Sequence, residues 1–305
     1  MNPEANAAPE NMTATPARTV TQMQTFYWSV RRELWEYRSV YVAPLAVAAV
    51  YLVAFLISSS IRLPNQMRAA LADADKMKHL VASYEFGAAA ILLAAMIVQL
   101  YYCLDSLQSE RRDRSILFWK SMPVSDAMTV LSKAAIPFAV LPAVGFCIVL
   151  ATGLAMILWS SVVLLVHGLS PAPLFTQLSL FDNALGLLNH MLTVHILWYA
   201  PLYAWLMFVS AWSKRAALLW AVLPWFAVGI FEKIVFNTSY FAHWIQMRFV
   251  GGMNDSASTG TMGTGGESHE MAWQFWTTPG LWLGLAVAVC LLAATVRIRR
   301  SREAN

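Results

Sequence analysis

Six apolar segments of the chain are long enough to cross a lipid bilayer as helices. The hydrocarbon layer is about 30 Å thick and a helix rises about 1.5 Å per residue, so a spanning helix needs about 20 mostly apolar residues. The segments run approximately from Tyr41 to Ser59, Glu85 to Leu104, Ala134 to Val166, Met191 to Ser210, Ala216 to Phe231 and Pro279 to Val296. This pattern predicts an all-α integral membrane protein with six transmembrane helices.

Two of these segments have features that affect how they cross. The third is longer than one perpendicular helix requires. Pro137 and Pro142 each remove a backbone donor near its start, so we expect a kink or a tilt there. The fifth is short and can continue past Glu232 and Lys233.

Composition supports the membrane class. Apolar residues make up 58% of the chain and charged residues 12%, against roughly 25% charged residues in soluble domains. The first forty residues contain no apolar run followed by a small-residue cleavage site, so we expect no removable signal peptide. Cys103, Cys147 and Cys290 lie in apolar stretches and fit neither a disulfide framework nor a Cys-x-x-Cys site. We predict that all three are small buried side chains.

The distribution of Lys and Arg predicts the orientation, because cytoplasmic flanks of spanning helices retain basic residues. If both termini are cytoplasmic, only a minority of the 21 basic residues fall in outer segments. These outer residues are Arg62, Arg68, Lys76, Lys78, Lys233 and Arg248. The bias therefore predicts a multi-pass protein of a bacterial inner membrane with both ends in the cytoplasm.

The region before the first span divides into a tail and a helix. Residues 1–24 are polar and predict a disordered cytoplasmic tail, followed by a six-span domain over residues 25–305. Apolar residues then recur at steps of four, four, three and four, at Phe26, Val30, Leu34, Tyr37 and Tyr41. This spacing predicts an amphipathic helix on the inner membrane surface, with Trp28 and Trp35 at headgroup level. The alternative is a cytoplasmic extension of the first span.

The loop between the second and third spans, residues 105–133, carries a dense set of charges and a short aromatic segment. We expect a helix from Arg114 to Ser121 that ends before Pro123, with Ser125 or Asp126 capping the next helix. One face of the short helix is apolar, with Ile116, Phe118, Trp119 and Met122, and Arg114, Lys120 and Ser121 lie largely opposite. Such a face is either packed beneath the membrane domain or inserted into a groove of a partner.

Here the chain resembles the permease subunits of ABC-2 type transporters. The resemblance rests on Glu110-Arg111-Arg112-Asp113-Arg114-Ser115, Phe118-Trp119-Lys120-Ser121-Met122-Pro123-Val124-Ser125 and Ser132-Lys133. It extends more loosely over the whole chain through six spans, a helix before the first span and a large last outer loop over residues 237–278.

The resemblance implies a coupling helix that seats in a cleft of a separate ATPase subunit, with ATP and Mg²⁺ bound there, and a permease that works as a pair. The implied ATPase-coupling residues are Glu110, Arg111, Arg112, Asp113, Arg114, Ser115, Phe118, Trp119, Lys120, Ser121, Pro123 and Val124. The chain has no Gly-x-x-x-x-Gly-Lys-[Ser/Thr] motif of its own. The nearest segment, 260–267, has Gly266 in the lysine position. The expected function is therefore coupling ATP hydrolysis to substrate movement, without an enzyme site in this chain. We expect export, with import as the alternative, and the substrate residues stay unassigned.

Other features of the sequence bear on alternative functions. His190 and His195 are five residues apart, which suits no α-helical ligand pair, so we expect polar interface residues rather than a metal site. Glu85, Gln99 and Glu232 are more simply explained by structural roles than by substrate contact. The motifs of a membrane protease or lipid hydrolase, His-Glu-x-x-His and Gly-x-Ser-x-Gly, are absent from the sequence. A membrane scaffold or sensor that binds a cytoplasmic protein through the same loop remains an alternative.

The outer segments are less informative. Residues 60–84 predict a charged loop, and residues 167–190 predict a proline-interrupted connection. The last outer loop contains a flexible Gly, Ser and Thr tract between two aromatic groups, which most simply mark the outer membrane interface.

Overall fold

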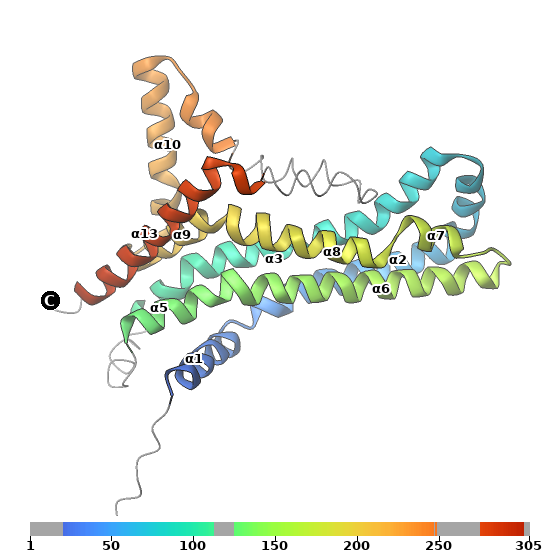
Figure 1. The fold of residues 1–305 in the computed structure, drawn as a ribbon, viewed down its shortest axis with the longest axis horizontal. Coiled ribbons are helices and arrows are strands. Elements are labelled where there is room, and N and C mark those ends of the chain that lie inside the picture. The colour runs from blue at the N-terminus through green and yellow to red at the C-terminus, as the bar shows by residue number, and fades with distance from the viewer. Residues whose placement is uncertain (1–20, 113–124, 247, 249–274, 302–305) are drawn as a thin grey trace, which may run out of the picture.

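The computed structural model describes residues 21–112, 125–246, 248 and 275–301, and every regular element in these ranges is helical (Figure 1). Among the residues described, five helices are long and apolar enough to cross a membrane. A bent pair of helices brings the number to six if the pair counts as one span. The predicted fold class, an all-α multi-span membrane protein, is confirmed.

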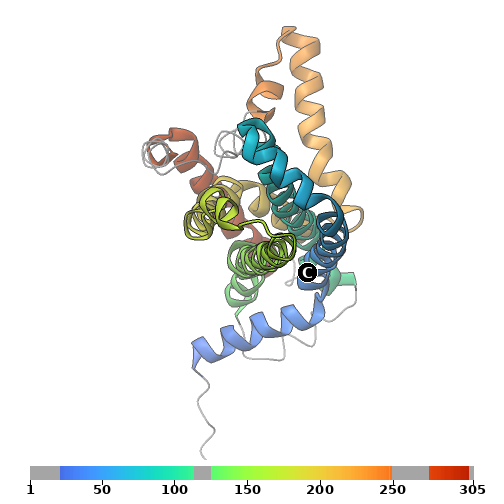
Figure 2. The same cartoon turned by 90° about the vertical axis from the view of Figure 1, so that its right-hand side faces the viewer.

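Helix α1 (Gln22–Glu36) is separate from the first span and lies across one end of the bundle (Figure 2). It includes the last residues of the predicted disordered tail, so that boundary was placed too late. The chain leaves helical geometry at Tyr37, with φ −100° and ψ 66°, which excludes a continuous extension of the first span. Val30 and Leu34 pack on a buried group that includes Tyr102. The predicted amphipathic helix is therefore present, and its apolar face covers protein.

The first two spans form a long helical hairpin. Helix α2 (Ser39–Ala72) and helix α3 (Ala74–Arg112) meet at Asp73, whose carboxylate accepts a hydrogen bond from the backbone N–H of Asp75 at 3.0 Å. The prediction of a charged loop over residues 60–84 is wrong, because α2 and α3 together continue through this segment. A helix of 39 residues is about 58 Å long at 1.5 Å per residue. It therefore extends well beyond the thickness of a hydrocarbon layer.

The third span contains a change of helix type where a proline kink was expected. Its elements are α5 (Asp126–Ala135), the π-helix η1 (Ile136–Val140) and α6 (Leu141–Val166). Pro137 and Pro142 lie at the starts of η1 and α6, where their missing N–H groups disturb the regular ladder least. The side-chain amide of Gln99 on α3 donates to the carbonyl oxygen of Pro137 at 2.7 Å. A neighbouring helix therefore satisfies a backbone acceptor in the π segment.

The fourth span is bent. It is built from α7 (Ala172–Gln177), α8 (Leu180–His190), the π-helix η2 (Met191–Trp198) and α9 (Ala200–Trp212). The two halves meet at an angle of 46° beside Tyr199. Pro201 follows at the first turn of α9, and a proline lacks the N–H that would continue the helix across the junction. The proline-interrupted connection predicted over residues 167–190 therefore contains two helices.

Helix α10 (Ala217–Phe236) projects away from the long axis of the bundle, as Figures 1 and 2 show from two sides. It continues past Glu232 and Lys233 as anticipated. Only 6% of the residues in its apolar 18-residue stretch are buried against the rest of the chain. The last helix, α13 (Pro279–Ser301), instead packs along α9, where the small residues Ala204 and Ala288 are both buried.

The largest core group lies between α3 and α9 and includes Cys103, Tyr203 and Met207, each fully buried. Cys147 and Cys290 are exposed on helix surfaces. The expectation of three buried cysteines is therefore wrong for two of them. Their apolar sequence context placed them correctly in spans but could not show which face of the helix they occupy.

Candidate functional site

A buried group of charged side chains lies where α3 ends and α5 begins, which we call the loop end of the bundle. Four helices contribute to it: α1, α3, α5 and α13. Its members, called the ionic cluster below, are Arg32, Glu33, Glu110, Asp126, Lys133 and Arg299. Three of these six residues are basic and three are acidic, and Arg32 also lies 3.9 Å from the carboxylate of the exposed Glu36.

Lys133 is at the centre of the ionic cluster. Its Nζ lies 2.9 Å from Oε1 of Glu33 and 3.2 Å from Oε1 of Glu110. All three side chains are at most 3% exposed. The hydroxyl of Tyr102 donates a further hydrogen bond to Oε2 of Glu33 at 3.1 Å. Because an unpaired charge at such a depth is strongly unfavourable, each carboxylate depends on its partners.

Glu110 extends the ionic cluster to the last helix of the chain. Its Oε2 accepts a hydrogen bond from Nη1 of Arg299 at 2.9 Å. Nε of Arg299 lies 3.4 Å from a carboxylate oxygen of Asp126, the first residue of α5. Arg32 from α1 lies 3.5 Å from Glu110. Glu110, in the last turn of α3, thus forms ion pairs with the helix that follows the loop, with α1 and with α13.

A second contact group joins the end of α1 to α3 beside the ionic cluster. The hydroxyl of Tyr37 lies 2.7 Å from Oγ of Ser109 and 3.2 Å from the carboxylate of Asp105. Burial holds the pKa of Tyr37 well above its usual range, so the hydroxyl stays protonated and can donate. The junction between α1 and α2 is therefore fixed to the last turns of α3.

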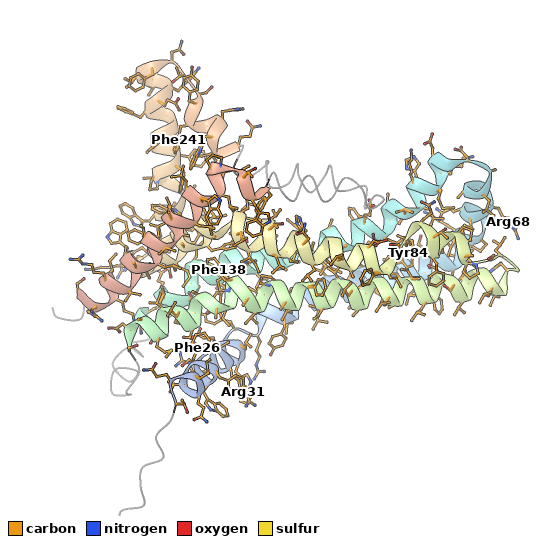
Figure 3. The ribbon with its side chains drawn as sticks, in the orientation of Figure 1. Phe26, Arg31, Arg68, Tyr84, Phe138 and Phe241 are labelled. Carbon is orange, nitrogen blue, oxygen red and sulfur yellow. The ribbon has the colours of Figure 1, made fainter. Side chains whose placement is uncertain are left out.

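The two sides of α1 carry different chemistry. Glu33 is 1% exposed and points into the ionic cluster. Arg31 lies on the side turned away from the bundle (Figure 3), with its guanidinium 5.1 Å from the ring of Trp28 and 5.4 Å from that of Trp35. These exposed aromatic and basic side chains are of the kind found at a membrane surface.

The predicted coupling residues divide into those the structure describes and those it does not. Glu110 is buried in the ionic cluster, and Arg111 and Arg112 complete the last turn of α3. Asp113, Arg114, Ser115, Phe118, Trp119, Lys120, Ser121, Pro123 and Val124 lie outside the described residues, so the coupling helix stays a prediction. Ser125 caps α5 by accepting from the N–H of Met128 at 3.2 Å. Ser125, and not Asp126, is therefore the cap of this helix.

The sequence did not predict that the residues of the ionic cluster lie together. Glu33 follows Val30 by three residues and precedes Tyr37 by four. That spacing places Glu33 on the apolar face. A carboxylate on the apolar face of an amphipathic helix is a signal that a buried cation lies opposite. Arg299 offered no comparable signal, because it lies among several basic residues at the end of a span.

A second polar contact lies inside the bundle. Nε2 of His195 is 3.0 Å from Oε1 of Gln99, whose amide bonds Pro137 as described above. His195 was expected at an interface but is 5% exposed in the core. An α-helical repeat does not apply to its spacing from His190, because His195 lies in the π-helix η2, which has a different repeat. Within the described ranges, no three His, Cys, Asp or Glu side chains are grouped as metal ligands.

Comparison with protein-family models, curated proteins and solved structures finds no match. What decides the class is therefore the set of long apolar helices. The chain is a multi-pass helical membrane protein.

Proposed function

We propose that this membrane protein is the permease subunit of an ABC transporter of the ABC-2 type, driven by a separate ATPase subunit and exporting its substrate. The observation that carries the proposal is that Glu110 and Lys133, on opposite sides of the loop, meet in one buried cluster. The residues that resemble a coupling helix lie between them. The loop is thus attached to the membrane domain at both ends.

The ionic cluster supports a mechanical role for this attachment. A force applied to the loop acts on α3 through Glu110 and on α5 through Asp126 and Lys133. The bonds of Glu33 and Arg299 extend that force to α1 and α13. Because a buried ion pair is costly to separate, these helices are expected to move together. An ATPase drives such a movement only if its nucleotide states differ in affinity for the conformations of the permease.

The orientation follows from the basic residues. The loop end carries Arg112, Lys214, Arg215, Arg297 and Arg300, which favours placing this end in the cytoplasm. An ATPase that binds ATP and Mg²⁺ in the cytoplasm would then meet the loop directly. The proposal includes a second permease copy or a related chain, as in the family that the loop resembles. The bacterial inner membrane is the proposed location.

The test uses Phe118 and Trp119, the aromatic residues of the proposed coupling helix. The tagged full-length chain is purified from its native membrane with the ATPase that accompanies it, and ATP hydrolysis is measured in reconstituted vesicles. Changing both residues to Ala is expected to reduce ATPase binding and stimulation at least tenfold. The loss of two aromatic contacts at an interface centre commonly has an effect of this size. Trp35→Ala is the matched control, because that side chain is 68% exposed on α1.

The outcomes separate the candidate functions. Undiminished ATPase binding and stimulation in the Phe118 and Trp119 variant would contradict the coupling role. A stable cytoplasmic partner without ATP hydrolysis would favour the scaffold or sensor. Chemical turnover by the purified chain alone would favour a membrane enzyme.

A further inference from the structure

A basic hollow lies at the loop end, apart from the ionic cluster. Its volume is about 510 Å³, and its described lining residues are Gln108, Arg112, Lys214, Arg215 and Ala216. Three of these side chains are basic and none is acidic. Lys214 and Arg215 are both exposed, so the described lining of the hollow presents basic side chains at an open surface.

The fold fixes both walls of the hollow. One wall is the last two turns of α3. The other is the turn between Trp212 and Ala217, where α9 ends and α10 begins. The hydroxyl of Ser210 on α9 accepts hydrogen bonds from the backbone N–H groups of Leu107 and Gln108, at 3.2 and 3.1 Å. These contacts hold the end of α9 against α3, so the basic side chains of the two walls stay close together.

The turn itself adds to the positive character. Ala216 adopts a left-handed conformation, with φ 52° and ψ 52°, and is the residue before the first turn of α10. It has no side chain that can cap the first N–H groups of the 20-residue helix. The amino-terminal end of α10, with its partial positive charge, therefore begins at the hollow. This contribution supplements the three basic side chains and does not replace them.

An apolar surface begins directly beside the hollow. Helix α10 leaves the bundle from this point, with Leu219 63% exposed and Leu223 56% exposed. At its base, the rings of Trp212 and Trp220 meet edge to face with their centroids 5.0 Å apart. Trp residues at such a boundary are typical of the headgroup level of a membrane. A charged recess thus adjoins a helix whose side chains suit hydrocarbon.

We propose that the hollow binds the phosphate group of an anionic phospholipid, with the acyl chains lying along α10. Basic pockets between spanning helices on the cytoplasmic side bind anionic headgroups. The guanidinium of Arg215 can donate two hydrogen bonds to one phosphate. A free phosphate would use the same charges but would gain nothing from the adjoining apolar surface. A zwitterionic lipid would bring its own cation into a recess that is already positive. The proposal does not require an ATPase partner.

Native mass spectrometry of the full-length chain in neutral detergent tests the proposal. Phosphatidylglycerol and phosphatidylcholine with the same acyl chains are titrated separately, and inorganic phosphate is added as a competitor. We expect the native protein to bind phosphatidylglycerol at least tenfold more tightly than phosphatidylcholine. Inorganic phosphate at equal concentration is expected not to displace it.

A pair of variants locates the site. The double variant Lys214→Gln, Arg215→Gln removes two exposed charges from the hollow. Since each basic side chain near a membrane surface contributes about fivefold to binding of anionic lipid, the affinity for phosphatidylglycerol is expected to fall about thirtyfold. Arg297→Gln, Arg300→Gln is the matched control, because it removes two exposed charges from α13 that do not line the hollow. The control is expected to change the affinity less than threefold.

Three results would overturn the proposal. Equal binding of the two lipids to the native protein would show that the headgroup charge is not recognised, whatever the variants do. Displacement by an equal concentration of inorganic phosphate would identify a site for a soluble anion. An equal loss of affinity in the two double variants would show that overall charge, and not this hollow, holds the lipid.

Discussion

Lys133→Met isolates the contribution of the ionic cluster to stability. Methionine keeps the length and much of the volume of the side chain but removes the charge that lies 2.9 Å from Glu33 and 3.2 Å from Glu110. Arg32 and Arg299 still contact these carboxylates, yet the six-residue cluster changes from neutral to a net charge of −1. Removing one partner of a buried ion pair costs about 3–5 kcal/mol. The remaining arginines should keep the loss near the lower end, at roughly 3 kcal/mol.

The assay is thermal unfolding of the purified chain in detergent, followed by intrinsic fluorescence. For a chain of this size, each kcal/mol corresponds to a shift in Tm of about 2–4 °C, so Lys133→Met should lower the Tm by about 6–12 °C. Lys76→Met is the matched control. Lys76 is 59% exposed and lies 3.8 Å from Asp73, and an exposed pair of this kind contributes at most about 1 kcal/mol.

A double variant distinguishes two causes of the stability loss in Lys133→Met, the charge imbalance and the loss of side-chain packing. Glu33→Gln added to Lys133→Met restores a neutral cluster, so the pair should be less destabilising than the sum of the two single changes by about 1–3 kcal/mol. Strict additivity would refute the electrostatic reasoning. A Tm of Lys133→Met equal to that of Lys76→Met would refute the claim that the cluster stabilises the loop end at all.

Two further predictions concern backbone geometry. Ala216→Gly should raise the free energy of unfolding by about 1 kcal/mol, because glycine adopts the left-handed conformation of this turn without the steric cost borne by alanine; a denaturant titration that shows no gain would contradict this. Gly284→Ala should lower the Tm by several degrees, because a Cβ there would collide with the guanidinium of Arg248. This guanidinium is held in place, since it lies over the ring of Trp198 and donates to the carbonyl oxygen of Gly280 at 3.1 Å. Gly280→Ala is its matched control, since a Cβ at that position meets nothing within 4 Å, and an equal Tm loss in both variants would count against the collision.

Local sequence patterns predicted the elements whose causes are local. The apolar segments marked the spans, and the spacing of Val30, Leu34 and Tyr37 marked α1. Ser125 was one of two expected caps and is the one used. The loop predicted over residues 60–84 was wrong because charge density was taken as a sign of irregular structure. Charged residues are compatible with helices that extend beyond the hydrocarbon layer.

The exposed course of α10 had no clear signal in the sequence, and Pro201 marks the bend beside Tyr199 without determining its angle of 46°. Hydropathy reports that a segment prefers an apolar environment, but it does not distinguish lipid from protein as that environment. The direction of α10 and the burial of His195 both depend on which helices pack together. The same limit explains the two exposed cysteines.

By itself, the sequence determined that the chain is a helical membrane protein, because about 20 consecutive apolar residues per segment can satisfy their backbone hydrogen bonds in a bilayer only as helices. Only the tertiary structure decided how the end of α3 and the start of α5 are held. Lys133 reaches Glu33 across 100 residues, and Arg299 reaches Glu110 across 189. The physical reason is that a charge becomes tolerable in the interior through partners that packing brings to it. No local pattern states which partners those will be.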